Sequence, residues 1–380
     1  MSDGTWTVHA SLDVSYRVAE TEDVLSPENG ALARAARTAP GDRRLIVVDE
    51  TVLADRAGEI EGYFRAWGVT PTVLALPGGE RTKVLASVER IAEAADSVAL
   101  SRRDPIVAVG GGVLTDLVGL AAGLYRRGTP YVRIPTTLIG LVDAAVGVKT
   151  AVNFHGHKNR LGSFHAASET LLDRGFLRTL STRHLSNGLA EIVKMGVIAD
   201  AELFDLLDAH AERLVDGRLD GPEGRRVIRL AVGSMLAELE PNLWEHDLRR
   251  AVDFGHTFSP ALEMAAQPGL LHGEAVSVDM ALSCALAVGQ GLQTADEALR
   301  VLALLRRVGL PVRHELCEVP FLVEALQDST RHRGGEQNLP LPIGIGKCSF
   351  AVGVTEAELG RACALLHRLH RLLDETGAAA

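Results

Sequence analysis

The chain has 380 residues, of which 47% are hydrophobic and 23% are charged, and its formal net charge at pH 7 is −10. These values are typical of a globular protein long enough for two packed domains. The net negative charge without a basic tract disfavours a nucleic-acid partner. No stretch reaches the roughly 18 apolar residues of a membrane-spanning helix, so we expect neither nucleic-acid binding nor membrane insertion.

Two further features of the composition bear on localisation. The four cysteines are scattered and form no C-x-x-C pair, which argues against a disulfide framework and a structural zinc knuckle. Residues 1–7 lack the basic region and following apolar run of a secretory signal. We therefore expect a cytoplasmic protein.

Short β-branched runs alternate with helical patterns in the first part of the chain. The runs cover residues 44–49, 72–76, 105–110 and 131–135, and a short helix is predicted over 115–125. Such alternation is typical of a parallel sheet covered by helices on both faces. It predicts an α/β nucleotide-binding domain over residues 1–182.

The pattern changes after residue 182. Apolar residues then recur at three- and four-residue spacing, which is typical of amphipathic helices. The clearest stretches are 189–197, 201–214, 225–239 and 274–289. Residues 328–347 are rich in Arg, Gly and Pro and are expected to form an irregular loop with a short strand. A mainly helical second domain is predicted over residues 183–380.

Three glycines at 110–112 directly follow the predicted strand 105–110. Glycine lets the backbone approach a diphosphate, and the free N–H groups that open the next helix favour anions, although tight turns also use glycine for steric reasons alone. Asp49 ends an earlier run, where it can accept hydrogen bonds from a ribose diol or cap a helix. Glu80 and Lys83 follow another glycine pair. These pieces predict a dinucleotide pocket without the usual G-x-G-x-x-G pattern.

Three residues of the predicted helical domain are candidate metal ligands: Glu191, His256 and His272. Two histidines and a carboxylate suit a catalytic Zn²⁺ with an open position for substrate oxygens. Sequence spacing does not establish that they converge, and hydrogen-bonded histidines with a solvated glutamate are the alternative. Lys194 lies three residues after Glu191, so one helix face would place an ammonium beside the metal.

Lysine is rare, since only five of the 39 basic residues are lysine. A compact ammonium suits positions where a guanidinium does not fit. Two of the lysines belong to a polar cluster within an apolar segment. The cluster consists of Asp143, Lys149, Asn153, Lys158, Asn159 and Arg160. It predicts a lined pocket, with a polar surface loop as the alternative.

In order and spacing these motifs resemble the dehydroquinate synthase superfamily over about residues 44–350. The matching residues are 110–116 (GGGVLTD), 134–137 (IPTT), Asp143, Lys149, Lys158, Asn159, Glu191, Lys194, His256 and His272. The resemblance implies NAD as cofactor, and Zn²⁺ or Co²⁺ bound by Glu191, His256 and His272. The NAD contacts that it implies are Asp49, Glu80, Lys83, Gly111, Gly112, Asp116, Thr136, Thr137, Lys149, Lys158 and Thr179.

Three departures from the dehydroquinate pattern concern the substrate. Those enzymes hold a heptulosonate carboxylate with cationic groups, including a lysine where this chain has Met235 and a histidine where it has Pro260. Asp253 stands where they have an asparagine. Because a carboxylate accepts hydrogen bonds from hydroxyl groups and repels another carboxylate, a ketose phosphate without a carboxylate is expected.

Several stretches place the chain within the superfamily. Residues 241–246, 253–260 and 339–346 resemble the 2-epi-5-epi-valiolone synthases, which act on sedoheptulose 7-phosphate. Ala166 and Ala167, where prolines are expected in that branch, look more like the desmethyl-4-deoxygadusol synthases, so that product and 2-epi-valiolone stay open. A dehydroquinate synthase, a glycerol-dehydrogenase-like oxidoreductase and a catalytically silent scaffold are the remaining alternatives.

The resemblance implies a reaction in which NAD⁺ takes a hydride from a ring carbinol, phosphate is eliminated, the hydride returns and an aldol addition closes the ring. In such a reaction the metal would polarise the carbinol and carbonyl oxygens. By the same resemblance, Lys149 and Lys194 would hydrogen-bond the reacting hydroxyls and the oxyanion, and Asp143 would orient the alcohol. The implied phosphate ligands are Asn159, Arg249 and Arg127, the last supplied by the partner subunit of a homodimer.

Overall fold

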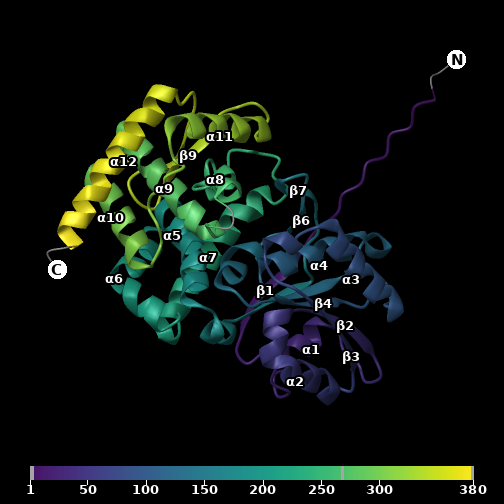
Figure 1. Ribbon diagram of the computed structural model, residues 1–380. Helices are drawn as coiled ribbons and strands as arrows, with labels where there is room; N and C mark the ends of the chain where they lie inside the picture. Colours follow the sequence, from purple (N-terminus) through teal and green to yellow (C-terminus); the bar gives the residue numbers. More distant parts are fainter. Residues whose placement is uncertain (1–3, 267–268, 378–380) are drawn as a thin grey trace.

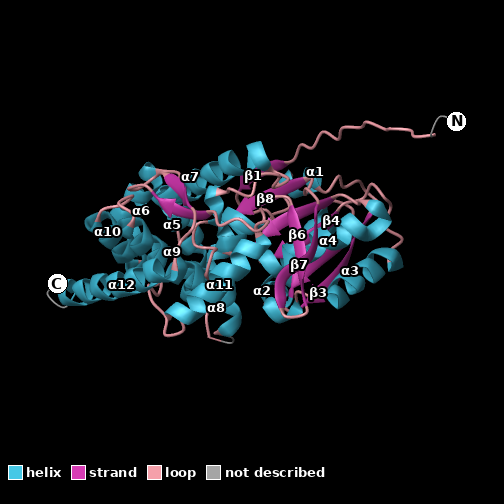
Figure 2. Cartoon of the chain, turned by 90° about the horizontal axis from the view of Figure 1, so that it is seen from above, coloured by secondary structure: helices cyan, strands magenta, loops and turns pink. Residues whose placement is uncertain are grey.

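The molecule has two halves that lie side by side, a parallel sheet with its helices and a bundle of helices (Figure 1 and Figure 2). The computed structural model describes residues 4–266 and 269–377. The sheet is formed by strands that precede residue 182, and the bundle is formed by the rest of the chain. This is the predicted α/β architecture with a mainly helical second part.

Six parallel strands form the main sheet, in the order β1-β8-β5-β4-β2-β3. They span Arg17–Thr21 (β1), Arg43–Asp49 (β2), Thr70–Leu76 (β3), Ile106–Gly110 (β4), Tyr131–Pro135 (β5) and Glu169–Asp173 (β8). β2 to β5 are the predicted strands, whereas β1 and β8 are additional. Because all neighbours run parallel, the carboxyl ends of the strands meet along one edge of the sheet, where ligands bind in open α/β sheets.

Helices cover both faces of this sheet, and they span Ala31–Ala35 (α1), Glu50–Ala66 (α2), Leu85–Ser97 (α3) and Gly112–Leu124 (α4). Successive side chains of a strand point to opposite faces. Ile46 and Val48 of β2 therefore pack in one apolar cluster with α1 and α2. Leu45 and Val47 pack in another with α3 and α4.

A β-hairpin lies where the two halves meet (Figure 2). It consists of β6 (Lys149–Phe154) and β7 (His157–Phe164), which pair antiparallel and pack against α4. Its backbone is tied to the sheet half, because Asn153 N–H donates to the carbonyl of Lys83 at 2.8 Å. The hairpin carries most of the predicted polar cluster.

The helical half is built around α5 (Thr182–Ile198) and α9 (His272–Gly289), which pack against each other. Both are buried along most of their length, and their buried residues include polar ones such as Asn187 and Glu191 of α5. The surrounding helices span Ala201–Asp216 (α6), Gly221–Leu239 (α7), Ser259–Ala265 (α8), Ala295–Arg307 (α10), Val319–His332 (α11) and Glu356–Gly377 (α12). A short antiparallel pair, β9 (Leu339–Pro342) and β10 (Cys348–Ala351), packs against this half.

Two predicted boundaries differ from the structure. α4 begins at Gly112, at the glycine turn itself. α11 runs to His332, so residues 328–332 are helical and do not belong to the predicted loop. Leu322 and Leu326 pack the apolar face of α11 into the core and support the longer helix. The predicted domain boundary after residue 182 falls at the start of α5 and stays a prediction. Among the described residues, no helix combines the length and the apolar character needed to cross a membrane.

Candidate active site

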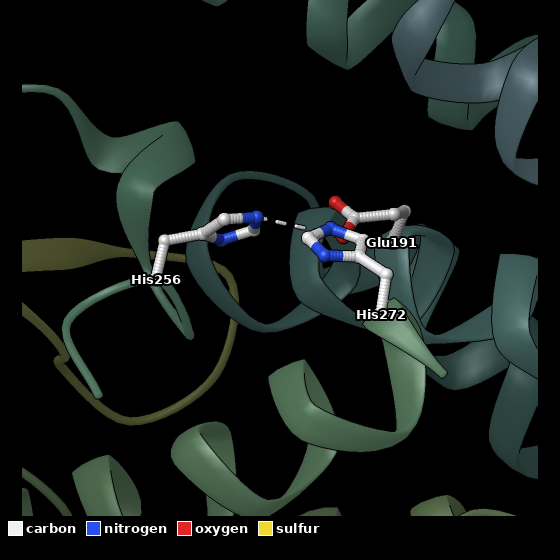
Figure 3. A group of neighbouring side chains, drawn as sticks. All are labelled: Glu191, His256 and His272. Atoms are coloured by element: carbon white, nitrogen blue, oxygen red, sulfur yellow. Dashed lines mark ion pairs between the residues drawn. The ribbon is translucent and has the colours of Figure 1, made fainter. Parts of the chain in front are cut away.

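Glu191, His256 and His272 lie together in the helical half, although they are far apart in the sequence (Figure 3). One ligand atom from each lies within 4.8 Å of the others. Glu191 Oε1 is 3.8 Å from His256 Nε2 and 3.4 Å from His272 Nε2, and the two imidazole centroids are 5.3 Å apart. The structure thus brings the three predicted ligands into one cluster.

Close packing of α5 against α9 sets this geometry. Gly273 N–H donates to Asn187 Oδ1 at 2.6 Å, and a Cβ at Gly273 would lie 2.0 Å from the carbonyl oxygen of Asn187. Only glycine permits this approach. Glu191 lies one turn after Asn187 on α5, and His272 precedes Gly273, so the contact brings the carboxylate beside the imidazole.

A buried carboxylate of α9 fixes the segment that carries His256. Asp279 Oδ2 accepts hydrogen bonds from the backbone N–H groups of Phe258 at 2.5 Å and Ser259 at 2.8 Å, where α8 begins. His256 itself lies within hydrogen-bonding distance of the Phe254 carbonyl through Nδ1, at 3.1 Å. With Nδ1 as the donor, Nε2 is left as the nitrogen that faces Glu191.

Burial and neighbouring charges shift the pKa values of the side chains in this cluster. Burial opposes ionisation of Glu191, but the ammonium of Lys194 and the two histidines hold the pKa of this carboxyl well below its usual value. Burial also opposes the charge of Lys194, but Glu191 and Asp143 raise the pKa of the amine. Burial and Lys194 lower the pKa of His256 to about 4, so that its imidazole is neutral at pH 7.

Glu263, which the sequence analysis did not single out, joins the cluster to the hairpin. Its Oε2 lies 3.0 Å from His272 Nδ1, and its Oε1 lies 2.7 Å from Lys158 Nζ on β7. Burial opposes the charge of His272, but the neighbouring carboxylates of Glu191 and Glu263 raise the pKa of the imidazole to about 9. No sequence periodicity distinguishes Glu263 from an ordinary helix glutamate, so its role follows from the fold alone.

The predicted dinucleotide residues gather at the carboxyl edge of the sheet. Asp49 accepts a hydrogen bond from Thr51 N–H at 2.9 Å and caps α2, which confirms the N-cap alternative. A Cβ at Gly78 would lie 2.6 Å from Asp49 Oδ2, so glycine lets this loop approach the end of β2. At Gly112 a Cβ would lie 2.9 Å from that of Ala144. Glycine at these two positions therefore permits packing that a larger side chain would obstruct.

A polar network connects this edge to the hairpin. Lys83 Nζ lies 2.6 Å from Asp116 Oδ2 on α4 and 2.6 Å from Asn159 Oδ1 on β7. Glu80 lies 3.7 Å from Lys158 Nζ and accepts a hydrogen bond from Asn153 Nδ2 at 2.7 Å. Arg160 is exposed. The polar cluster is therefore not a plain surface loop, and its residues do not all line one wall of a pocket.

Thr136, Thr137 and Thr179 follow the ends of sheet strands. Thr136 N–H donates to the Gly110 carbonyl at 3.0 Å, and Thr137 Oγ1 accepts from Gly140 N–H at 3.2 Å, so both belong to the turn after β5. Thr179 donates its hydroxyl hydrogen to the Phe176 carbonyl at 3.5 Å. Within the described part of the chain, no hydrogen bond joins Thr179 to the other candidate residues.

The residues predicted to hold substrate lie on several elements, and Asp143 lies near the cluster. Burial and the nearby Glu191 raise the pKa of Asp143, which lies in the turn after β5. Lys149, whose side chain is 55% exposed, pairs with Glu245. Glu245 is a second residue that the sequence analysis did not single out. The guanidinium of Arg249 lies over the Phe350 ring, and Arg127 is exposed, with a left-handed backbone after α4.

Replacing Glu263 by glutamine is expected to weaken metal binding about 10- to 100-fold, the usual effect of losing an outer partner of a histidine ligand. Glutamine keeps the size of the side chain but loses the carboxylate that lies beside His272 and Lys158. Competition with a chromophoric chelator measures the zinc dissociation constant. Glu356→Gln, at the exposed start of α12, is a matched control, and equal zinc affinity in both variants would contradict the expectation.

Comparison with known proteins identifies two family models along the chain. Residues 73–187 match the 3-dehydroquinate synthase N-terminal model, and residues 188–332 match the 3-dehydroquinate synthase C-terminal model. Together the two matches span most of the sheet half and much of the helical half.

Curated relatives cover nearly the whole chain. A 2-epi-5-epi-valiolone synthase of Streptomyces hygroscopicus subsp. jinggangensis is 50% identical over 97% of this chain and 91% of its own length. A demethyl-4-deoxygadusol synthase of Trichormus variabilis is 38% identical over 92% and 87%. The solved structure of the 2-epi-5-epi-valiolone synthase ValA from the same Streptomyces, with NAD⁺ and Zn²⁺ bound, matches with a TM-score of 0.92, 50% identity, and coverage of 96% and 99%.

Proposed function

The chain belongs to the 3-dehydroquinate synthase family, and from this we propose that it is a 2-epi-5-epi-valiolone synthase, which cyclises sedoheptulose 7-phosphate and releases phosphate. The observation that carries the proposal is the 50% identity to such a synthase over nearly the full length of both chains. The lower identity to the demethyl-4-deoxygadusol synthase makes that product the second candidate.

The candidate metal centre fits a divalent cation. Both carboxylate oxygens of Glu191 are buried and, within the described residues, neither makes a well-aligned hydrogen bond, although Lys194 is paired with Oε2. Two imidazole nitrogens face the same carboxylate. Glu191, His256 and His272 would hold Zn²⁺ or Co²⁺, which supplies Lewis-acid polarisation of a substrate oxygen.

The carboxyl edge of the sheet fits a dinucleotide. The glycine turn opens α4 directly after β4, so its N–H groups and the helix dipole suit a pyrophosphate. The residues that would hold NAD⁺, a reversible hydride acceptor, are Asp49, Glu80, Lys83, Gly111, Gly112, Asp116, Thr136, Thr137, Lys149, Lys158 and Thr179. Since the hairpin contacts both this edge and Glu263, it connects the residues that would hold the cofactor to those that would hold the metal.

The chain's own side chains then position the sugar phosphate. Lys194 is buried and carries a raised pKa, so it stays an ammonium that donates to an oxyanion. Lys149 donates to a hydroxyl from the more open side, and Asp143 accepts a hydrogen bond from the alcohol. Asn159 and Arg249 bind the phosphate, whose departure leaves these donors free for the next substrate.

Arg127 completes the phosphate site from the partner subunit of a homodimer, which is part of the proposal. Support comes from its position, because it is exposed and its guanidinium makes no hydrogen bond or ion pair within the described chain. Analytical ultracentrifugation would test the dimer.

The four cysteines are free, in keeping with a cytoplasmic enzyme.

Two positions that carry cationic groups in the dehydroquinate synthases are uncharged in this chain. Met235 is buried in α7, and Pro260 occupies the first turn of α8, where neither offers a charge. Asp253 adds a negative charge, because Arg250 and Arg333 outweigh burial and lower the pKa of its carboxyl. The heptulosonate of the dehydroquinate synthases is therefore a poor fit.

The test is to incubate the zinc-loaded protein with sedoheptulose 7-phosphate and catalytic NAD⁺, and to follow phosphate release together with NMR of the product. Phosphate release without net NADH supports the cyclase, and the product's stereochemistry separates 2-epi-5-epi-valiolone from 2-epi-valiolone and desmethyl-4-deoxygadusol. Stoichiometric NADH would instead indicate a glycerol-dehydrogenase-like enzyme, and turnover of the heptulosonate alone would indicate a dehydroquinate synthase.

A further inference from the structure

A row of alternating charges runs along the substrate side of the site and ends on an arginine outside the predicted set. Lys149 pairs with Glu245, whose Oε1 also lies 2.5 Å from Arg250. Arg250 lies 3.4 Å from Asp253 Oδ1, and Arg333 lies 3.4 Å from the other oxygen, Oδ2. The signs therefore alternate from the hairpin to the end of α11, with a cation at each end.

Arg333 is buried and held by contacts with the surrounding protein. It follows the last residue of α11, is only 8% exposed, and donates from Nη1 to the carbonyl of Asn338 at 3.0 Å. Arginine is almost never this buried without a partner. The carboxyl end of a helix also favours a cation. Its guanidinium is thus fixed in place and directed at Asp253.

The neighbouring arginine does not serve Asp253 alone. Arg250 is shared with Glu245, and its distance to Glu245 is shorter than its distance to Asp253. Glu245 also pairs with Lys149, whereas without Arg333 the largely buried carboxylate of Asp253 would keep only the shared Arg250. A carboxylate with limited access to water needs a compensating charge, so Arg333 is the cation dedicated to Asp253.

We propose that Arg333 is a positioning residue that fixes the Asp253 carboxylate through their ion pair at 3.4 Å and so selects a hydroxyl-bearing ketose phosphate over one that carries a carboxylate. An ionised aspartate accepts hydrogen bonds from hydroxyl groups and repels an anionic group. Arg333 compensates the charge from within the protein, since it is only 8% exposed and directs Nη2 at Asp253 and Nη1 at the Asn338 carbonyl. The inference rests on the proposed function and deepens it.

A double-mutant cycle tests the pair with Arg333→Gln, Asp253→Asn and the combined variant. Arg333→Gln is expected to raise KM for sedoheptulose 7-phosphate about tenfold with a smaller change in kcat, the size of effect seen for coupled contacting residues. The combined variant should be no worse than the poorer single variant. Arg333→Lys should restore part of the loss. Arg331→Gln, on the same helix, 70% exposed and paired with Asp328, is the matched control.

The same four proteins are compared in thermal unfolding without substrate, which measures the pairing independently of turnover. Non-additive shifts in Tm and KM together support the proposal. Wild-type KM in Arg333→Gln, or strictly additive effects in both measurements, would overturn it. If the wild-type enzyme fails to turn over the ketose phosphate, the proposed function falls and the selective role falls with it, whereas the thermal cycle still decides whether the pair exists.

Discussion

Glu191→Gln is expected to lower zinc affinity by more than the roughly 100-fold that loss of an outer partner costs, because it removes an anionic ligand. The same change leaves Lys194, a buried ammonium whose closest partner is Glu191, without that negative charge. Breaking a buried ion pair from one side costs roughly 3–5 kcal/mol of the free energy of unfolding. Cyclase activity should fall to the background of the metal-free enzyme.

Zinc content after dialysis, zinc affinity and denaturant unfolding check the three parts of this prediction separately. The control is Glu202→Gln, which removes an exposed glutamate of α6 that pairs with Arg226 and should leave all three quantities unchanged. Wild-type zinc affinity in Glu191→Gln would remove this residue from the metal centre, even if stability fell.

Lys83→Met should weaken NAD⁺ binding by at least about tenfold, which corresponds to roughly 1.4 kcal/mol. Lys83 is the buried cation that joins Asp116 on α4 to Asn159 on the hairpin. Burial opposes its charge, but Asp116 and Glu80 raise the pKa of the amine, so the ammonium is present at neutral pH. Without it, Asp116 loses its counter-charge at the dinucleotide edge.

Equilibrium titration with NAD⁺ and chemical denaturation measure the two consequences. We expect a loss of roughly 3–5 kcal/mol in stability, as for other broken buried pairs. Lys347→Met removes an exposed lysine and is the matched control. If Lys83→Met and Lys347→Met bound NAD⁺ alike, the network would be structural and would not belong to the cofactor site.

The β-strand and glycine patterns are strong enough in the sequence to predict β2 to β5 and the dinucleotide edge. β1 (RVAET) and β8 (ETLLD) escape this kind of analysis because both begin and end with polar residues, and their pairing joins Arg17–Thr21 to Glu169–Asp173 across most of the sheet half. Such pairing is set by the fold and not by local preference. The same holds for α11, whose Leu322 and Leu326 pack into the core on the turns before residues 328–332.

The residues of the candidate site were likewise only partly predictable from the sequence. Residue types alone single out the three metal-ligand candidates, and the structure brings them together. Glu263 and Arg333 could not be found this way, because a helix glutamate and an arginine among Gly and Arg residues look like ordinary surface side chains. Their importance comes from partners on other elements, His272 and Asp253, which only the tertiary structure supplies.

The uneven exposure of the lysines has a practical consequence for chemical footprinting. Lys83 and Lys194 are buried, and Lys158 is held by two carboxylates, whereas Lys149 is open at the substrate side and Lys347 is exposed elsewhere. A mild acylating reagent followed by peptide mass spectrometry should therefore mark chiefly two lysines. Lys347 then serves as an internal reference. The labelling of Lys149 relative to Lys347 measures the occupancy of the substrate site without an optical probe.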